Sequence, residues 1–168
     1  MFIFILLFQN GVFAATDQFK AFLSSDFSTD SSSLASILLA CRSFQTLGYT
    51  NAMGTDNYQK YATRSSVMNY INNSGNNYGL YISSHGNTDL ISMKLNNSSE
   101  YIYPSQISGN WHLVFLDSCS SLATNSFANS FKTNGYSNRA TLGWYMTVTT
   151  YASSEFFKYF HVLVGTTN

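Results

Sequence analysis

The chain has 168 residues, which suits one domain or one domain with short extensions. Its 8 Lys and Arg residues balance its 8 Asp and Glu residues, and so few cations make a poor nucleic-acid-binding surface. A 17% aromatic content excludes a disordered chain, and two cysteines are too few to hold a small fold together by disulfides. A packed core must therefore supply the stability, under a nearly uncharged polar surface of a kind more common in secreted proteins.

The first residues have the pattern of a signal peptide. Residues 2–8 (FIFILLF) form an apolar run too short to span a bilayer, and Val12 and Ala14 fit cleavage after Ala14. No Lys or Arg precedes the run, so a buried first strand is the alternative interpretation. We favour a signal peptide over residues 1–14 and a domain over residues 15–168. We then expect a secreted or extracytoplasmic protein with no stable membrane insertion after signal removal.

Short apolar runs alternate with helical patterns along the rest of the chain. In chain order, we expect a strand at 19–24, a helix at 34–47, a strand at 49–53, a helix at 61–73, a strand at 78–84, a hairpin at 90–95 and 100–103, a strand at 112–117, a helix at 122–131, a strand at 139–144 and a helix at 151–163. Asp30 or Ser31 can cap the first helix, and Gly48 can end it. Strands that alternate with helices predict an α/β fold with a mostly parallel central sheet.

Sequence motifs for common cofactors are absent. The chain has no phosphate-binding loop, no dinucleotide-binding turn, no zinc-binding helix and no serine-hydrolase elbow. Its three histidines and two cysteines also lack the spacing of a zinc site. We therefore expect neither a metal nor a cofactor.

His85 and Cys119 each follow the carboxyl end of an expected core strand. Ligands of open α/β sheets bind in the crevice outside these strand ends, so the two side chains share one crevice if their strands are neighbours. A nearby imidazole favours the nucleophilic thiolate, and the pair therefore suits acyl transfer. The backbone amides of Gly86 and Cys119 would then form an oxyanion hole.

Two segments carry a family resemblance. Residues 81–86 (YISSHG) and 113–119 (LVFLDSC) resemble the signatures of caspase-like (clan CD) cysteine peptidases, the group of caspases, gingipains, clostripain, legumains and metacaspases. The resemblance extends over residues 19–160 and implies a three-layer sandwich whose mostly parallel sheet is flanked by helices. Such folds usually carry a sixth strand after the last helix. Residues 161–168 show no obvious strand pattern, which leaves open a chain without the last strand, or a piece of a longer precursor.

The resemblance implies a cysteine endopeptidase that hydrolyses a peptide or protein substrate through an acyl-enzyme. By position, Cys119 would be the nucleophile and His85 the general base or acid. The amides of Gly86 and Cys119 would hold the oxyanion. Asp117 matches the acidic position before the nucleophile, where its side chain would make supporting hydrogen bonds.

The substrate pocket of this group draws on the loop after the first strand and on the strand after the nucleophile. Ser25, Asp26 and Trp144 occupy such positions. Asp26 at the base of the pocket would favour Arg or Lys in the substrate by charge pairing. In the alternative interpretation, Asp26 is a loop or capping residue.

Other interpretations of the same residues stay open. A non-catalytic binding or structural module of a secreted protein could keep this fold, and a transpeptidase would pass the acyl group to an amine.

The remaining cysteine and histidines are interpreted as structural residues. We expect Cys41 to be a buried free thiol; the alternative is a Cys41–Cys119 disulfide, which would abolish the nucleophile. His112 and His161 read as structural. Asn-x-Ser sequons, which matter only if the source glycosylates its secreted proteins, begin at Asn72, Asn96 and Asn97.

Overall fold

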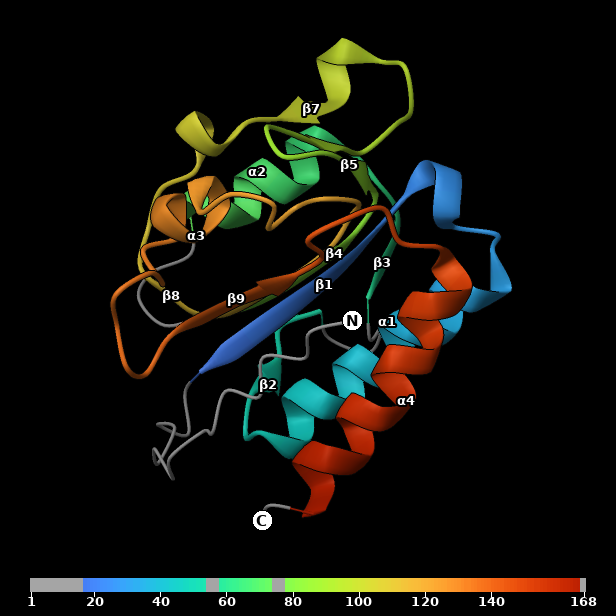
Figure 1. The fold of residues 1–168 in the computed structure, drawn as a ribbon, viewed down its shortest axis with the longest axis vertical. Helices are drawn as coiled ribbons and strands as arrows, with labels where there is room; N and C mark the ends of the chain where they lie inside the picture. The colour runs from blue at the N-terminus through green and yellow to red at the C-terminus, as the bar shows by residue number, and fades with distance from the viewer. Residues whose placement is uncertain (1–16, 54–57, 74–77, 167–168) are drawn as a thin grey trace.

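A six-stranded parallel sheet forms the middle layer of the protein (Figure 1). The computed structural model describes residues 17–53, 58–73 and 78–166. Its strand order is β2-β1-β4-β8-β9, and β3 also pairs with β1, with every pairing in this sheet parallel. The strands are β1 (Gln18–Ser24), β2 (Thr50–Asn51), β3 (Gln59–Ala62), β4 (Tyr78–Ser83), β8 (Trp111–Asp117) and β9 (Ala140–Gly143).

Helices cover both faces of the sheet, which confirms the predicted three-layer α/β architecture. In Figure 1, α1 (Ser31–Thr46) and α4 (Thr150–Thr166) lie side by side on one face, while α2 (Arg64–Asn73) and α3 (Ser126–Ser130) lie on the other. Asp30 caps α1 as expected, because its carboxylate accepts a hydrogen bond of 2.7 Å from the Ser33 N–H. Gly48 follows that helix in the left-handed region, with φ at +93°.

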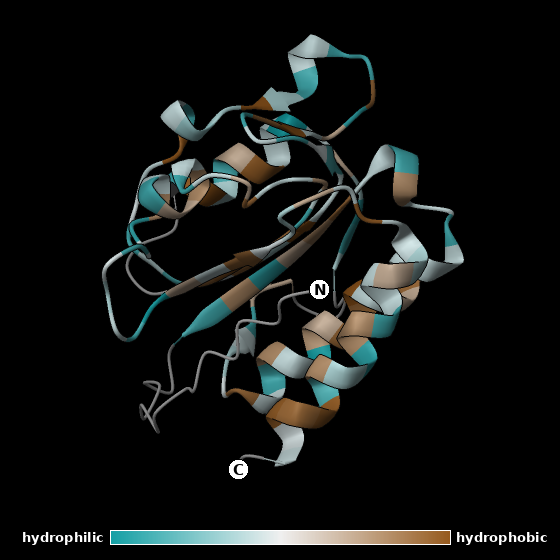
Figure 2. Ribbon diagram, in the orientation of Figure 1, coloured by the Kyte–Doolittle hydropathy of each residue, from teal (hydrophilic) through white to brown (hydrophobic). Residues whose placement is uncertain are grey.

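The central strands are apolar on both sides because both faces of the sheet are packed. Along β1, Phe19, Ala21 and Leu23 join the core under α1 and α4, whereas Phe22 joins the core under α2 and α3. Figure 2 shows hydrophobic residues along the central strands and hydrophilic ones in the outer loops. Two separate cores therefore hold the sheet in place from its two faces.

Two predicted helices were partly wrong. Residues 59–62 form the edge strand β3, because the Tyr61 N–H donates to the Ser28 Oγ and Tyr61 has a left-handed φ of +51°. Of the helix expected over residues 122–131, only α3 forms. The preceding residues turn instead, because the Ser121 hydroxyl donates to the Leu116 carbonyl and the Leu122 N–H donates to Trp144.

A small antiparallel sheet extends the carboxyl end of β4. It consists of β5 (His85–Gly86), β6 (Ile91–Ser92) and β7 (Tyr101–Ile102), so the predicted hairpin forms in shortened form and His85 starts an additional strand. A short 3-10 helix, η1 (Ser25–Phe27), follows β1 at the same end of the main sheet. The expected signal peptide lies outside the described residues. Within the described ranges, no helix is long and apolar enough to cross a membrane.

Candidate active site

The pairing of β4 with β8 places His85 and Cys119 at matching positions. Ser83 pairs with Asp117 at the carboxyl ends of these adjacent parallel strands, and the two candidate residues each follow two positions later. The Ser84 N–H continues the register by donating to the Asp117 carbonyl at 3.2 Å. The structure therefore brings both backbones out at one edge of the sheet, as the sequence predicts for neighbouring strands.

Two buried hydroxyl groups join the chains just before these residues. The Oγ atoms of Ser84 and Ser118 lie 2.9 Å apart, and the Ser84 hydroxyl also donates to the His85 carbonyl at 3.0 Å. Gly86 packs so closely on this pair that a Cβ added to it would lie 2.8 Å from the Ser118 Cβ. Glycine is thus required after His85 by packing, in addition to any part its amide plays in an oxyanion hole.

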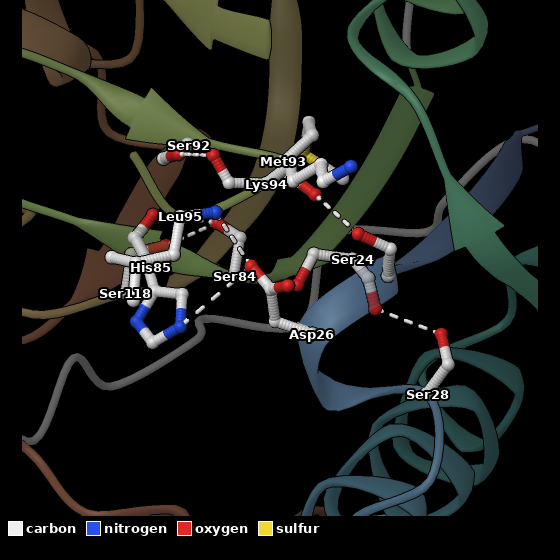
Figure 3. A network of polar contacts seen from close by, with 11 residues as sticks. Ser24, Asp26, Ser28, Ser84, His85, Ser92, Met93, Lys94, Leu95 and Ser118 are labelled. Carbon is white, nitrogen blue, oxygen red and sulfur yellow. Dashed lines mark hydrogen bonds and ion pairs between the residues drawn. The ribbon is translucent and has the colours of Figure 1, made fainter. Parts of the chain in front are cut away.

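The His85 ring lies between a carboxylate and an aromatic ring. Its Nε2 is 3.9 Å from the Asp26 Oδ2, and its ring centroid is 4.6 Å from that of Phe27. The same Asp26 oxygen accepts a hydrogen bond of 2.6 Å from the Leu95 N–H, so the backbone fixes the carboxylate (Figure 3). Asp26 therefore faces His85, with about a third of each side chain exposed (29% and 32%).

The Cys119 side chain points toward the loop after β9. Its Sγ donates to the Val148 carbonyl at 3.5 Å. Among the described residues, the Cys119 N–H has no hydrogen-bond partner. Ser120 follows in the left-handed region with φ at +52°, and its N–H donates to the Met146 carbonyl at 3.1 Å. Strained backbone of this kind is concentrated at functional sites.

The two cysteines are free and lie in different environments. The alternative of a Cys41–Cys119 disulfide is therefore not realised. Cys41 is 2% exposed in the core between α1 and the sheet, and burial raises its thiol pKa to about 12. Cys119 is only partly buried. Cys119, at the strand ends, is therefore the more accessible of the two thiols.

Asp117 lies beneath Cys119 as a buried carboxylate. Its Oδ2 accepts hydrogen bonds of 2.7 Å from the hydroxyls of Tyr81 and Ser153, and its Oδ1 accepts one of 2.8 Å from the Trp144 indole. Burial raises the pKa of Asp117, and these donors act against that rise. The carboxylate thus ties β4, α4 and the segment after β9 to the end of β8.

A small cavity of about 20 Å³ opens beside Cys119, enough for roughly one water molecule. Phe27, Asp117 and Ser153 line it, and residues 148–150 form one wall. The described lining does not include Ser25 or Asp26, which the sequence assigned to the substrate pocket. A cavity of this size is too small for a substrate side chain, so binding one would require residues of the lining to move.

The three residues assigned to the substrate pocket fall into two separate places. The Ser25 hydroxyl donates to the Met93 carbonyl at 3.3 Å and Asp26 faces His85, whereas Trp144 packs against Phe115 and bonds to Asp117. Sequence reasoning missed the contacts of Phe27, Ser84, Ser118 and Ser153 at the site. A serine directly before both His85 and Cys119 was the one local signal available.

The described residues contain no group of three or more His, Cys, Asp and Glu side chains that could hold a metal ion.

Comparison with protein-family models, curated proteins and solved structures found no match for this chain. The likeness to caspase-like peptidases therefore depends on the two strand-end segments, 81–86 and 113–119.

Proposed function

We propose that the protein is a cysteine peptidase of the caspase-like kind, with Cys119 as nucleophile and His85 as general base and acid. The observation that carries this proposal is the register of β4 and β8, which sets both residues two positions beyond the Ser83–Asp117 pair. In an open α/β sheet, this strand-end edge is where ligands bind. A thiol with an imidazole as its base suits attack on a carbonyl carbon, and in this proposal His85 serves Cys119 in that way.

The proposed reaction uses the four groups already described. The Cys119 sulfur attacks the carbonyl carbon of the peptide bond while its proton passes to His85. The N–H groups of Gly86 and Cys119 stabilise the oxyanion. The C–N bond then breaks, and His85 returns the proton to the departing amine, which leaves a thioester on Cys119. His85 next takes a proton from water while the water oxygen attacks the thioester carbon. The C–S bond then breaks, the product leaves with a new carboxyl group, and His85 returns the proton to the Cys119 sulfur.

Asp26 has a positioning part in this proposal. A carboxylate beside Nε2 favours the tautomer with the proton on that nitrogen, which leaves Nδ1 as the base. At 3.9 Å the pair is too long for a direct hydrogen bond, and such contacts often tighten only when substrate is bound. The bond from the Leu95 N–H already holds the Asp26 oxygen at the ring.

The substrate residue before the cleaved bond is proposed to be Arg or Lys. The charge in the cavity beside Cys119 belongs to Asp117, so this preference is assigned to Asp117 rather than to Asp26. Tyr81, Ser153 and Trp144 donate to this carboxylate and Ser83 is a further side-chain partner, so the substrate cation would pair with Asp117 by charge. A comparison of peptides with Arg or neutral citrulline before the cleaved bond tests this without altering the buried network. Equal kcat/KM values for both would remove Asp117 from substrate selection.

A second candidate function is a binding module without catalysis. It is favoured by the direction of the Cys119 thiol, which donates to the Val148 carbonyl, and by the small volume of the adjacent cavity. In this interpretation the strand-end edge binds a peptide without cleaving it. Both proposals keep the expectation of a secreted protein. This expectation depends on the signal-peptide pattern, which lies outside the described residues.

A peptide-library cleavage profile separates the two candidates. The wild-type protein, Cys119→Ala, His85→Ala and the control Cys41→Ala are purified in the same way and compared. The peptidase proposal expects cleavage by the wild type and by Cys41→Ala, and none by the other two. Peptide binding without cleavage would favour the module. Equal cleavage by the wild type and Cys119→Ala would show that a contaminant was responsible. An added amine nucleophile in the same reactions would reveal transpeptidation as a new amide product.

A further inference from the structure

A second and larger cavity opens on the other side of Asp26. It has a volume of about 270 Å³ and lies between η1, the end of β3 and the segment 93–100 of the small sheet. Ser25 and Lys94 line it, and these residues are the chain neighbours of Asp26 and Leu95, which form the contact beside His85. Figure 3 shows Asp26 pointing toward His85, with Met93 and Lys94 drawn above these two residues.

The lining of this cavity combines an apolar floor with a polar rim. Ala62 and Met93 are each 1% exposed and form the floor. On the rim, the Glu100 carboxylate is already engaged, because its Oε2 accepts a hydrogen bond of 2.6 Å from the Arg64 N–H. The exposed Lys94 ammonium has no hydrogen-bond or ion-pair partner among the described residues. The Glu100 oxygen is thus held by a backbone N–H but keeps its charge, whereas the Lys94 ammonium is the charged group of the lining that a ligand can still pair with.

The position of His85 assigns a direction to the bound peptide. In the proposed mechanism, His85 gives its proton to the departing amine, so the residues after the cleaved bond must lie on the His85 side of Cys119. In the strand order, β1 and β3 lie on the far side of β4 from β8, so Asp26 in η1 and the cavity at the end of β3 are on the His85 side. The small cavity beside Cys119 extends instead toward residues 148–150, which follow β9.

We infer that the cavity between Ser25 and Lys94 is the subsite for the substrate residues that follow the cleaved bond, and that it selects an acidic side chain there. This inference rests on the proposed peptidase function. The apolar floor would contact the methylene groups of Asp or Glu, and Lys94 would pair with the carboxylate at the rim. The preference should be modest, about five-fold, because a partly exposed charge pair is worth about 1 kcal/mol.

Internally quenched peptides provide the test. They keep one sequence before the cleaved bond and carry Glu, Gln or Lys at the first two positions after it. We expect wild-type kcat/KM to be highest for Glu and Lys94→Glu to reverse the order of Glu and Lys. The control Arg42→Glu changes the net charge equally, from an exposed position on α1 at the opposite face of the sheet, and should leave the order unchanged. Equal Glu-to-Lys ratios in wild type and Lys94→Glu would overturn the subsite.

A loss of all cleavage would count against the peptidase and not against the cavity. In that case the same Glu and Lys peptides are titrated into wild type and Lys94→Glu, and the backbone amide resonances of residues 93–97 are followed by NMR. Shifts at these residues that favour the Glu peptide in wild type, and the Lys peptide in Lys94→Glu, would support the cavity as a binding site for acidic peptides. No shift at these residues would overturn it.

Discussion

The hydroxyl groups of Ser84 and Ser118 lie 2.9 Å apart and join the two chain segments that carry His85 and Cys119. Both serines are almost fully buried, with 2% and 1% exposed, so neither hydroxyl can turn to water if the other is removed. The pair therefore links the two segments just beyond the backbone pairing of β4 and β8.

Removing one hydroxyl of this pair should destabilise the protein. We expect Ser84→Ala to lower the free energy of unfolding by about 1–3 kcal/mol, because Ser118 is left buried and unpaired. The double variant Ser84→Ala/Ser118→Ala should lose less than the sum of the single variants, since it leaves no orphaned hydroxyl. Urea unfolding of the four proteins measures this coupling. Strict additivity would mean that the hydroxyls do not stabilise one another.

Gly86→Ala should disturb both the fold and the site. Its new Cβ would lie 2.8 Å from the Ser118 Cβ and 3.0 Å from the Leu90 carbonyl oxygen, and backbone atoms cannot easily give way. We expect a loss of about 1–3 kcal/mol in unfolding free energy and reduced cleavage. Gly165→Ala is the matched control, because nothing lies within 4 Å of its Cβ, and it should stabilise α4 by up to about 1 kcal/mol. Equal stabilities of the two variants would contradict this packing argument.

Asp26 should affect turnover more than substrate affinity. Asp26→Asn still accepts the Leu95 N–H but loses its charge, so we expect kcat to fall about five-fold while KM stays constant. Asp26→Ala also loses the anchor to Leu95 and should fall further. Asp89→Asn, which removes the same charge from an exposed position between β5 and β6, serves as control. A wild-type kcat in both Asp26 variants would show that Asp26 does not position the ring.

Cys41 should ionise only at high pH. Burial raises its pKa from 9.0 to about 12 in the folded protein, so the unfolded chain loses this proton first as pH rises. The stabilising effect of the protonated thiol is therefore complete below pH 9 and declines toward pH 12. We expect iodoacetamide to leave Cys41 unmodified at pH 8 in the folded protein and to modify it in urea. Rapid modification of Cys41 without urea would contradict its buried position.

The main features of the fold could be predicted because each depends on local pattern. The apolar runs around Phe22 and Val114 indicate buried parallel strands, and parallel strands put their carboxyl ends at one edge, which is why the shared position of His85 and Cys119 was predictable. The contact of Asp26 with Leu95 spans 69 positions in the chain and depends on how the small sheet folds over η1. No pattern in the sequence encodes that approach, so the position of the Asp26 carboxylate beside His85 could not be predicted.

Edge strand β3 shows a second reason why part of the fold could not be predicted from the sequence. Its residues carry a weak helical pattern, and the strand forms only because β1 offers an unpaired edge and Ser28 binds the Tyr61 N–H. Tertiary contacts here override local preference. The hydrogen bonds between Asp117 and its three partners likewise join residues from β4, α4 and the segment after β9, and such convergence is visible only in the folded structure.

Covalent labelling by a thiol-directed peptidyl inhibitor tests the central claim most directly. Folded protein under reducing conditions is treated with a peptidyl acyloxymethyl ketone that carries Arg next to the reactive group, and the modified residue is located by mass spectrometry. We expect one adduct, on Cys119, that is absent in Cys119→Ala, greatly slowed in His85→Ala and unchanged in Cys41→Ala. Folded wild-type protein that forms no adduct, or forms it equally well in His85→Ala, would contradict a Cys119–His85 peptidase.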